Sequence, residues 1–130
     1  MARTLTIHRG GPHLTGQDHG RAGYLAEGLS LGGAADRLAL AEGAALLGQP
    51  ADTAAVEMAG HGGTFEASED ARIALTGARM RADIDGKPLI WNASHMLPAS
   101  ARLTIGGSLE GAYGYLHVGG GINTHALLTS

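Results

Sequence analysis

The densest group of chemically useful side chains lies in a glycine-rich stretch between residues 10 and 36. Gln17, Asp18 and Arg21 fall within one short segment there, among glycines that let the backbone bend sharply. Arginine can bind a carboxylate through two parallel hydrogen bonds, and glutamine can both donate to and accept from an amide. The segment therefore predicts a loop that binds a carboxylate or an amide substrate. The alternative is that Asp18 and Arg21 pair with each other or cap neighbouring backbone groups.

A second candidate for acid or base chemistry is Glu57, which alternates with apolar residues on either side. On a strand, this alternation turns the carboxylate away from the apolar face, either into solvent or into a polar interior. Carboxylates are common general acids and bases. We therefore take Asp18 and Glu57 as candidate catalytic residues, and Gln17 and Arg21 as candidate substrate-binding residues.

Seven histidines raise the question of a metal site, but their spacing does not favour one. No two of them form a His-x-His pattern or stand four residues apart on the predicted helix, so we predict no zinc site. His117 shares a strand face with Tyr113 and Tyr115, which predicts a packed face satisfied by hydrogen bonds; a wall of ligands is the alternative. Phe65 and Trp91 are expected in the core. The absence of cysteine excludes disulfides and thiolate chemistry.

The composition is that of one globular domain. The chain has 130 residues, of which 44% are hydrophobic and 16% charged, and its 22 glycines indicate many turns. The net charge of -3 is spread along the sequence without a basic stripe, so no nucleic-acid partner is expected. No apolar run has the length of a signal peptide or a membrane span, so we expect a cytoplasmic location and no membrane contact.

One amphipathic helix is predicted over residues 34–47. Leu40, Ala44 and Leu47 recur there at helical spacing and are expected to form its buried stripe. Asp36 stands near the start, where a carboxylate suits the positive end of the helix dipole. Gly48, followed closely by a proline, is a typical stop signal.

The other elements that must position these side chains are short strands. Alternating apolar residues predict strands over residues 3–8, 53–59, 72–76, 80–85, 87–91, 101–105 and 112–118. Asp85-Gly86 predicts a tight hairpin turn. After Gly119 we see no strand pattern. Many short strands separated by turns indicate a barrel or a sandwich rather than a parallel sheet.

Several motifs follow one another along the chain in a characteristic order. They are Gly11-Pro12, Thr15-x-Gln17-Asp18-x-Gly20-Arg21-x-Gly23-Tyr24, Gly32-Gly33-Ala34-x-Asp36, Leu47-x-Gln49-Pro50-Ala51-Asp52-x-Ala54-Ala55-x-Glu57, Ala74-Leu75-Thr76-Gly77-Ala78, Asp85-Gly86-x-Pro88, Trp91 and Tyr115-Leu116-x-Val118-x-Gly120-Gly121-Ile122. This order resembles the biotin-dependent carboxyltransferase family, which includes allophanate hydrolase subunit 2 and the C subunit of 5-oxoprolinase. The resemblance covers essentially the whole chain and matches the N-terminal half of a longer family chain.

The resemblance implies a fold and a reaction. The fold would be mainly β, a cyclophilin-like β-barrel with one helix, forming a single domain over residues 1–130. The implied activity is that of a hydrolase subunit in an ATP-dependent 5-oxoprolinase complex, which opens 5-oxo-L-proline to L-glutamate and in which this chain is not active alone. Within it, Arg21 would clamp a carboxylate or phosphate, Gln17 would orient the amide, and Asp18 and Glu57 would supply acid and base.

The resemblance also implies partners and leaves two other functions open. The expected partners are a second cyclophilin-like subunit resembling the sporulation-kinase inhibitor, a possible third, hydrolase subunit, and a small amide substrate. One alternative is a carboxyltransferase component that moves carboxylate from carboxybiotin to urea or a similar amide. Since the chain has no Met-Lys-Met biotinylation signal, the biotin would be carried on another chain. The other alternative is a non-catalytic binding module that antagonises a kinase-inhibitor partner.

Overall fold

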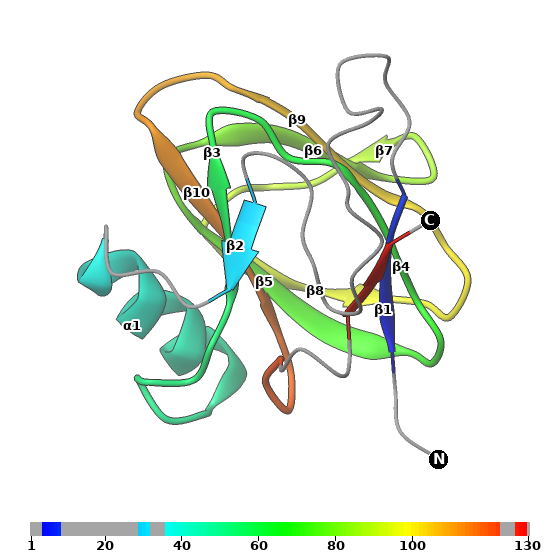
Figure 1. Ribbon diagram of the computed structural model, residues 1–130, viewed down its shortest axis with the longest axis horizontal. Coiled ribbons are helices and arrows are strands. Elements are labelled where there is room, and N and C mark those ends of the chain that lie inside the picture. The colour runs from blue at the N-terminus through cyan, green and yellow to red at the C-terminus, as the bar shows by residue number, and fades with distance from the viewer. Residues whose placement is uncertain (1–3, 9–28, 32–35, 123–126, 130) are drawn as a thin grey trace.

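The computed structural model shows two β-sheets with one helix on the outer face of one of them (Figure 1). It describes residues 4–8, 29–31, 36–122 and 127–129. Sheet A contains, in spatial order, β11 (Leu127–Thr129), β1 (Leu5–His8), β4 (Thr64–Ala67), β9 (Leu103–Ser108), β6 (Met80–Ile84) and β7 (Lys87–Pro88). Sheet B contains β2 (Leu29–Leu31), β3 (Val56–Ala59), β10 (Tyr113–Val118), β5 (Ala71–Gly77) and β8 (Ala93–Leu97).

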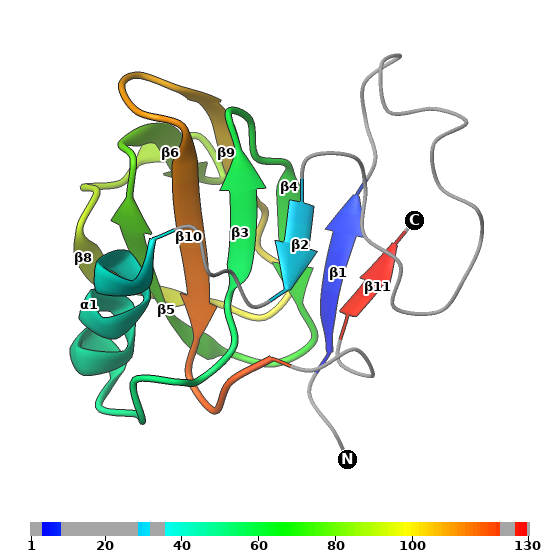
Figure 2. The same ribbon diagram turned by 60° about the vertical axis from the view of Figure 1, so that its left-hand side comes forward.

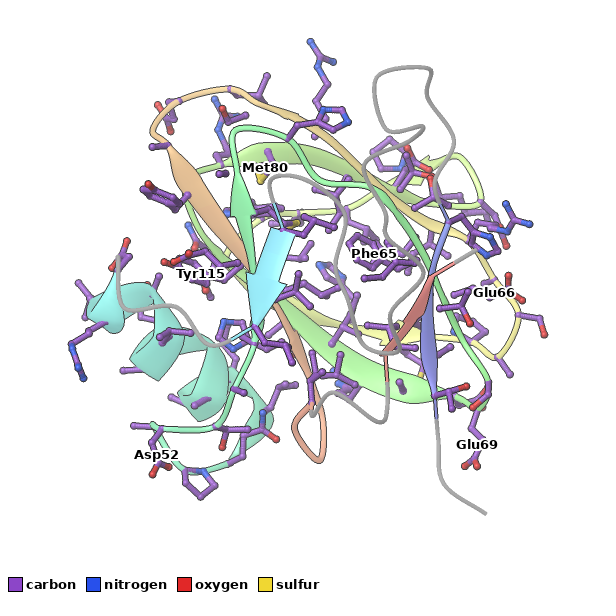
Figure 3. The ribbon with its side chains drawn as sticks, in the orientation of Figure 1. Asp52, Phe65, Glu66, Glu69, Met80 and Tyr115 are labelled. Carbon is purple, nitrogen blue, oxygen red and sulfur yellow. The ribbon has the colours of Figure 1, made fainter. Side chains whose placement is uncertain are left out.

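The core lies between the inner faces of the two sheets. Alternate residues of each strand point inward, as expected for the two-residue period of β structure. Phe65 of β4, Leu103 of β9 and Leu75 of β5 are completely buried there. Figure 3 shows Phe65 among the strands, whereas Tyr115 lies toward the helix. The outer face of sheet B is therefore covered separately, by the helix.

Helix α1 (Arg37–Leu47) packs on the outer face of sheet B against β5 and β10 (Figure 2). Asp36 is its N-cap, because its Oδ1 accepts a hydrogen bond from the backbone N–H of Ala39 at 3.0 Å. Gly48 ends the helix in the left-handed conformation, with φ of 69°. Both predicted boundary signals are thus confirmed, and the helix begins three residues later than predicted.

The buried face of the helix agrees with the predicted stripe at Ala44 but not at its leucines. Ala39, Gly43 and Ala44 are its buried residues, whereas Leu40 is only half-buried. The helix lies close to the sheet because small side chains separate them, so the larger leucines lie toward the edges of the contact. Leucine spacing alone did not reveal this close approach.

The mainly β fold with one helix is confirmed, but the described strands form two sheets rather than a closed barrel. Sheet A ends at β7, which has only two residues and includes Pro88. Proline lacks an N–H and cannot donate to a further strand, so it suits an edge position. The Asp85-Gly86 turn between β6 and β7 is also confirmed, with φ of 50° and 86° at its two residues.

Four strands were not predicted, namely β2, β4, β8 and β11. The most direct error concerns the segment after Gly119, where no strand was expected. There β11 pairs in parallel with β1, and Leu5 lies opposite Leu127. A three-residue strand has too few residues to show alternation, so only its pairing partner could reveal it.

Candidate active site

A row of residues crosses the outer face of sheet B and brings the candidate chemistry together. Glu57, Tyr115 and Thr76 lie opposite one another on β3, β10 and β5. Partners in an antiparallel pair have their side chains on the same face of the sheet. Glu57 is thus placed on the face opposite the core, because its neighbours Val56 and Met58 point inward, which agrees with the predicted alternation.

Glu57 and Tyr115 form a short hydrogen bond at the centre of this row. The Tyr115 hydroxyl donates to Oε2 of Glu57 at 2.5 Å, a length typical of a bond to a charged acceptor. Tyr115 is fully buried, whereas Glu57 keeps partial exposure. The carboxylate of Glu57 is therefore held in a fixed orientation by a buried phenol, at a place that solvent or a ligand can reach.

The surroundings of Tyr115 keep its hydroxyl protonated at neutral pH. Burial raises the pKa of Tyr115 well above its usual value, and the hydrogen bond and negative charge of Glu57 raise it further. A hydrogen bond from the backbone of Asp36 opposes this rise in pKa, although the charge of Asp36 adds to it. The phenol therefore stays protonated at neutral pH and acts as the hydrogen-bond donor that orients Glu57.

The helix reaches this row at its N-terminus. Asp36 uses its side chain to cap α1, while its backbone faces the Tyr115 hydroxyl. The expected role of Asp36 at the helix start is confirmed. Its second contact was not predicted, because nothing in the sequence shows that the helix would lie over β10.

A second polar group lies beneath the helix, next to Tyr115. Thr76 donates its hydroxyl proton to the carbonyl oxygen of Ala39 at 2.8 Å, and its oxygen lies 2.9 Å from Nε2 of His117. Because the threonine proton is committed to Ala39, Nε2 of the imidazole must carry the proton that joins His117 to Thr76. His117 is fully buried, and burial lowers its pKa to about 4, so it is neutral at neutral pH.

Gly43 explains how the helix approaches His117 so closely. A Cβ atom added at Gly43 would lie 1.9 Å from Nε2 of the imidazole. Only a glycine fits at this point of the helix, and the ring fills the space that a side chain would occupy. The predicted packing of this strand face, with its polar groups satisfied by hydrogen bonds, holds for Tyr115 and His117. It does not hold for Tyr113, which is exposed, and Nδ1 of His117 has no partner among the described residues.

The other predicted site residues lie outside the described residues. Gln17, Asp18 and Arg21 belong to residues 9–28, so their roles stay predictions. Glu57 is described, and its position beside Tyr115 is compatible with the predicted acid or base role, which also stays a prediction. Tyr115 is the functional candidate that sequence reasoning missed, because its contact with Glu57 depends on the pairing of two strands far apart in the chain.

The chemistry available at this site is that of an oriented carboxylate. Glu57 can accept a proton or a hydrogen bond from an amide N–H, and Tyr115 fixes the direction from which it does so. In the described part of the chain, no three histidine, aspartate or glutamate side chains converge in a way that could hold a metal ion. The described helix is also too short to cross a bilayer.

Comparison with known proteins shows relatives over almost the whole chain. The chain is 35% identical to the C subunit of 5-oxoprolinase from Escherichia coli (strain K12) over 127 residues, which is 97% of this chain and 41% of that protein. It is 36% identical to the corresponding 5-oxoprolinase chain of Haemophilus influenzae over 105 residues, or 81% of this chain and 34% of that protein. The chain therefore spans about two fifths or less of the length of these relatives.

Solved structures give the same fold. A crystal structure of TTHA0988 superposes with a TM-score of 0.66 at 26% identity, covering 71% of this chain and 35% of that one. Kluyveromyces lactis urea carboxylase superposes with a TM-score of 0.67 over 75% of this chain and 10% of that enzyme, and at 16% identity this likeness concerns the fold alone. The family model for the carboxyltransferase domain, subdomain A and B, matches residues 27–130. Since that match covers most of the sequence, the chain belongs to the carboxyltransferase domain family.

Proposed function

We propose that this chain is part of the C subunit of an ATP-dependent 5-oxoprolinase, which opens 5-oxo-L-proline to L-glutamate. The observation that carries the proposal is the 35% identity to the C subunit of a 5-oxoprolinase over 97% of the chain. A second relative with the same name supports it. The oriented carboxylate of Glu57 is the part of the described structure that suits this chemistry.

Opening the lactam requires proton transfer at two atoms. The C–N bond of the ring breaks, a hydroxyl group from water joins the carbonyl carbon, and the ring nitrogen becomes the amino group of glutamate. An amide nitrogen is a poor leaving group, so a nearby acid or base accelerates the reaction. Glu57 is the candidate for this role, and Tyr115 is a positioning residue that sets the direction of its carboxylate.

Binding of the substrate carboxylate is assigned to Arg21, with Gln17 orienting the amide and Asp18 as a further acid or base. These roles rest on the sequence. A guanidinium group matches a carboxylate through two hydrogen bonds, and a glutamine side chain can pair with a lactam through both of its polar atoms. The stretch that holds them leads directly into β2, whose Ser30 lies opposite Glu57 in the sheet.

The described site does not fit the phosphates of ATP. Glu57 and the N-cap Asp36 both place negative charge near Tyr115, and these charges would repel a polyphosphate. We therefore assign ATP binding to other parts of the complex. The proposed partners are a second cyclophilin-like subunit and a possible hydrolase subunit, in a cytoplasmic assembly.

A second candidate function is carboxyl transfer from carboxybiotin to an amide such as urea. The specific observation in its favour is the match to a family model named for the carboxyltransferase domain. The two functions share a chemical need, because each must orient an amide nitrogen beside an acid or base. They differ in the product, which is glutamate in one case and a carboxylated amide in the other.

The experiment that tests the proposal is glutamate release from 5-oxoproline and ATP by the purified complex, with and without this chain. Glu57→Gln keeps an oxygen that can accept from Tyr115 but removes the charge, so we expect kcat to fall by about 100-fold or more with little change in KM. Tyr115→Phe leaves the ring in place and should reduce kcat by about tenfold. Glu69→Gln, at an exposed position, is the matched control and should leave kcat unchanged.

Two outcomes would refute these assignments separately. Glutamate release that is unaffected by omitting the chain would reject the proposed function. Normal kcat for Glu57→Gln in a folded, active complex would reject the role of Glu57 but not the function of the chain. Carboxylation of urea in the presence of carboxybiotin, without glutamate release, would favour the second candidate.

A further inference from the structure

A cleft of about 540 Å³ lies beside β6 and has no part in the site described above. Its walls are formed by β6, the β6–β7 turn, the segment from Pro88 to Asn92, and Leu109. Neither Glu57 nor Tyr115 lines it. Its volume falls within the range of small-molecule sites in proteins.

The cleft exists because the two sheets do not meet along this edge. Sheet A ends at the short strand β7 and sheet B ends at β8, and the segment between these strands spans the gap. Trp91 is held at the back of the cleft by a hydrogen bond from its Nε1 to the carbonyl oxygen of Gly77, at 3.1 Å. The wall is therefore rigid at the position of the indole ring.

Two arginines give the cleft a positive lining. Arg79 and Arg81 both contribute to its wall, together with the single carboxylate of Asp83. Asp83 already accepts a hydrogen bond from the backbone N–H of Gly86 at 3.1 Å. The net charge of the lining is thus positive in a chain whose own net charge is -3. Such a local reversal of sign favours an anionic ligand.

The arginines are available for a ligand. Arg81 is exposed and forms no ion pair with any described residue. Arg79 is 3.6 Å from Glu110, measured from Nε to Oε1, and both side chains are more than half exposed. An ion pair this exposed contributes little free energy and can open at low cost.

A bulge in β9 lies directly across from Arg81. Met80 pairs with Ser108 and Ala82 pairs with Ile105, so Gly106 and Gly107 both face Arg81. Bulges of this kind change the direction of a side chain and are frequent beside binding sites. The two glycines leave the space beside Arg81 clear of side chains.

Much of the remaining lining is apolar and partly exposed, and Asn92 is a polar exception. Ile90 is 75% exposed and Leu109 is 44% exposed, although both are large hydrophobic residues. They form an exposed apolar rim beside the arginines, and the buried ring of Trp91 belongs to the same wall. Exposed apolar residues that gather beside a charged cleft indicate contact with a ligand.

We propose that this cleft is a binding site for a small organic monocarboxylate with an apolar body. The carboxylate is bound by Arg81 and Arg79 through charge-assisted hydrogen bonds, and the apolar body lies against Trp91, Ile90 and Leu109. Asp83 in the lining selects against multiply charged anions, because its repulsion grows with the charge of the ligand. The site is separate from the Glu57–Tyr115 site and independent of the function proposed for it.

Trp91 is the only tryptophan of the chain, so its fluorescence reports on this cleft alone. We would titrate the full chain with hexanoate, hexanol, hexylammonium, acetate and inorganic phosphate, without ATP or partner subunits. Hexanoate should cause a saturable change with a Kd of about 1 mM, the affinity that its size allows. The other four compounds should bind at least about tenfold more weakly.

Matched variants separate the two parts of the site. Arg81→Gln should weaken hexanoate binding by about tenfold, the effect of losing one charge-assisted hydrogen bond. Arg37→Gln removes another exposed arginine, on α1, and should leave the affinity unchanged. Ile90→Ser should reduce the preference for hexanoate over acetate. If Arg81→Gln fails to fold, as judged by circular dichroism, Arg79→Gln takes its place.

Four results would overturn the proposal. Equal binding of hexanol and hexanoate would show that the arginines do not recognise the anion. Tighter binding of phosphate than of hexanoate would show that the apolar rim plays no part. A Trp91 signal that does not change with hexanoate, or an unchanged affinity in Arg81→Gln, would show that the ligand does not bind in this cleft.

Discussion

Replacing Gly43 by alanine tests the packing of α1 on sheet B. In the middle of a helix this change ordinarily stabilises a protein by about 1 kcal/mol, because alanine loses less backbone entropy on folding. Here the opposite sign is expected. The new methyl group would lie 1.9 Å from Nε2 of His117 and 2.2 Å from two neighbouring ring carbons.

The size of the effect follows from that distance. Carbon atoms in contact are normally about 3.5 Å apart, so the helix and the ring must separate by roughly 1.5 Å. Overpacking of this kind costs about 1–3 kcal/mol. A shift of α1 also strains the hydrogen bond from Thr76 to Ala39, which contributes about 1 kcal/mol. After the gain in helix propensity, we expect a net loss of about 2 kcal/mol.

Urea unfolding, followed by circular dichroism, measures this loss directly. For a domain of this size, about 2 kcal/mol also corresponds to a decrease in Tm of roughly 6–10 °C. The matched control is the same substitution in a His117→Ala background, where the ring is absent. There Gly43→Ala should be neutral or stabilising, because the methyl group enters vacated space. If Gly43→Ala is as stable as the native chain, or equally damaging in both backgrounds, the proposed contact between helix and ring is wrong.

Two further predictions concern the same helix and the core beneath it. Because the pKa of His117 is about 4 in the folded chain and 6.5 when unfolded, only the unfolded chain gains a proton between these values. The free energy of unfolding should therefore decrease by about 2 kcal/mol as the pH falls from 7.5 to 4.5. In His117→Gln this decrease should be absent, and urea unfolding at both pH values measures it. Leu40→Ala should lower the free energy of unfolding by no more than about 1 kcal/mol, because Leu40 is half-buried. Leu75→Ala, at a fully buried position, should lower it by about 2–5 kcal/mol, and thermal or urea unfolding measures both losses. Equal losses for these two leucines would contradict the observed helix face.

Local signals in the sequence predicted the parts of the fold that local interactions determine. The N-cap Asp36 and the terminating Gly48 act within one turn of the helix, so their residue types suffice to place its ends. Asp85-Gly86 determines its own turn in the same way. The outward direction of Glu57 follows from alternation within a single strand. None of these features depends on a distant segment.

The missed features depend on which strands are neighbours. Alternation indicates that Glu57 and Tyr115 are both on outer positions, but only the β3–β10 register places them opposite each other. The glycine face of α1 was missed for a similar reason, because Gly43 matters only through the ring of His117 on β10. The cleft beside Arg81 depends on the path of the segment between β7 and β8 relative to β6, and no local pattern in the sequence gives that path.

The position of α1 joins the stability of the domain to its candidate site. Asp36 faces the Tyr115 hydroxyl at the N-terminus of the helix, and Gly43 meets His117 further along the same helix. Tyr115 and His117 are on the same face of β10, with ring centres 6.5 Å apart. A helix displaced at Gly43 must therefore also move Asp36 relative to Tyr115. The close packing of α1 at Gly43 thus fixes the position of Asp36 beside the Tyr115 hydroxyl, which in turn orients Glu57. This explains why buried polar groups gather beneath this helix.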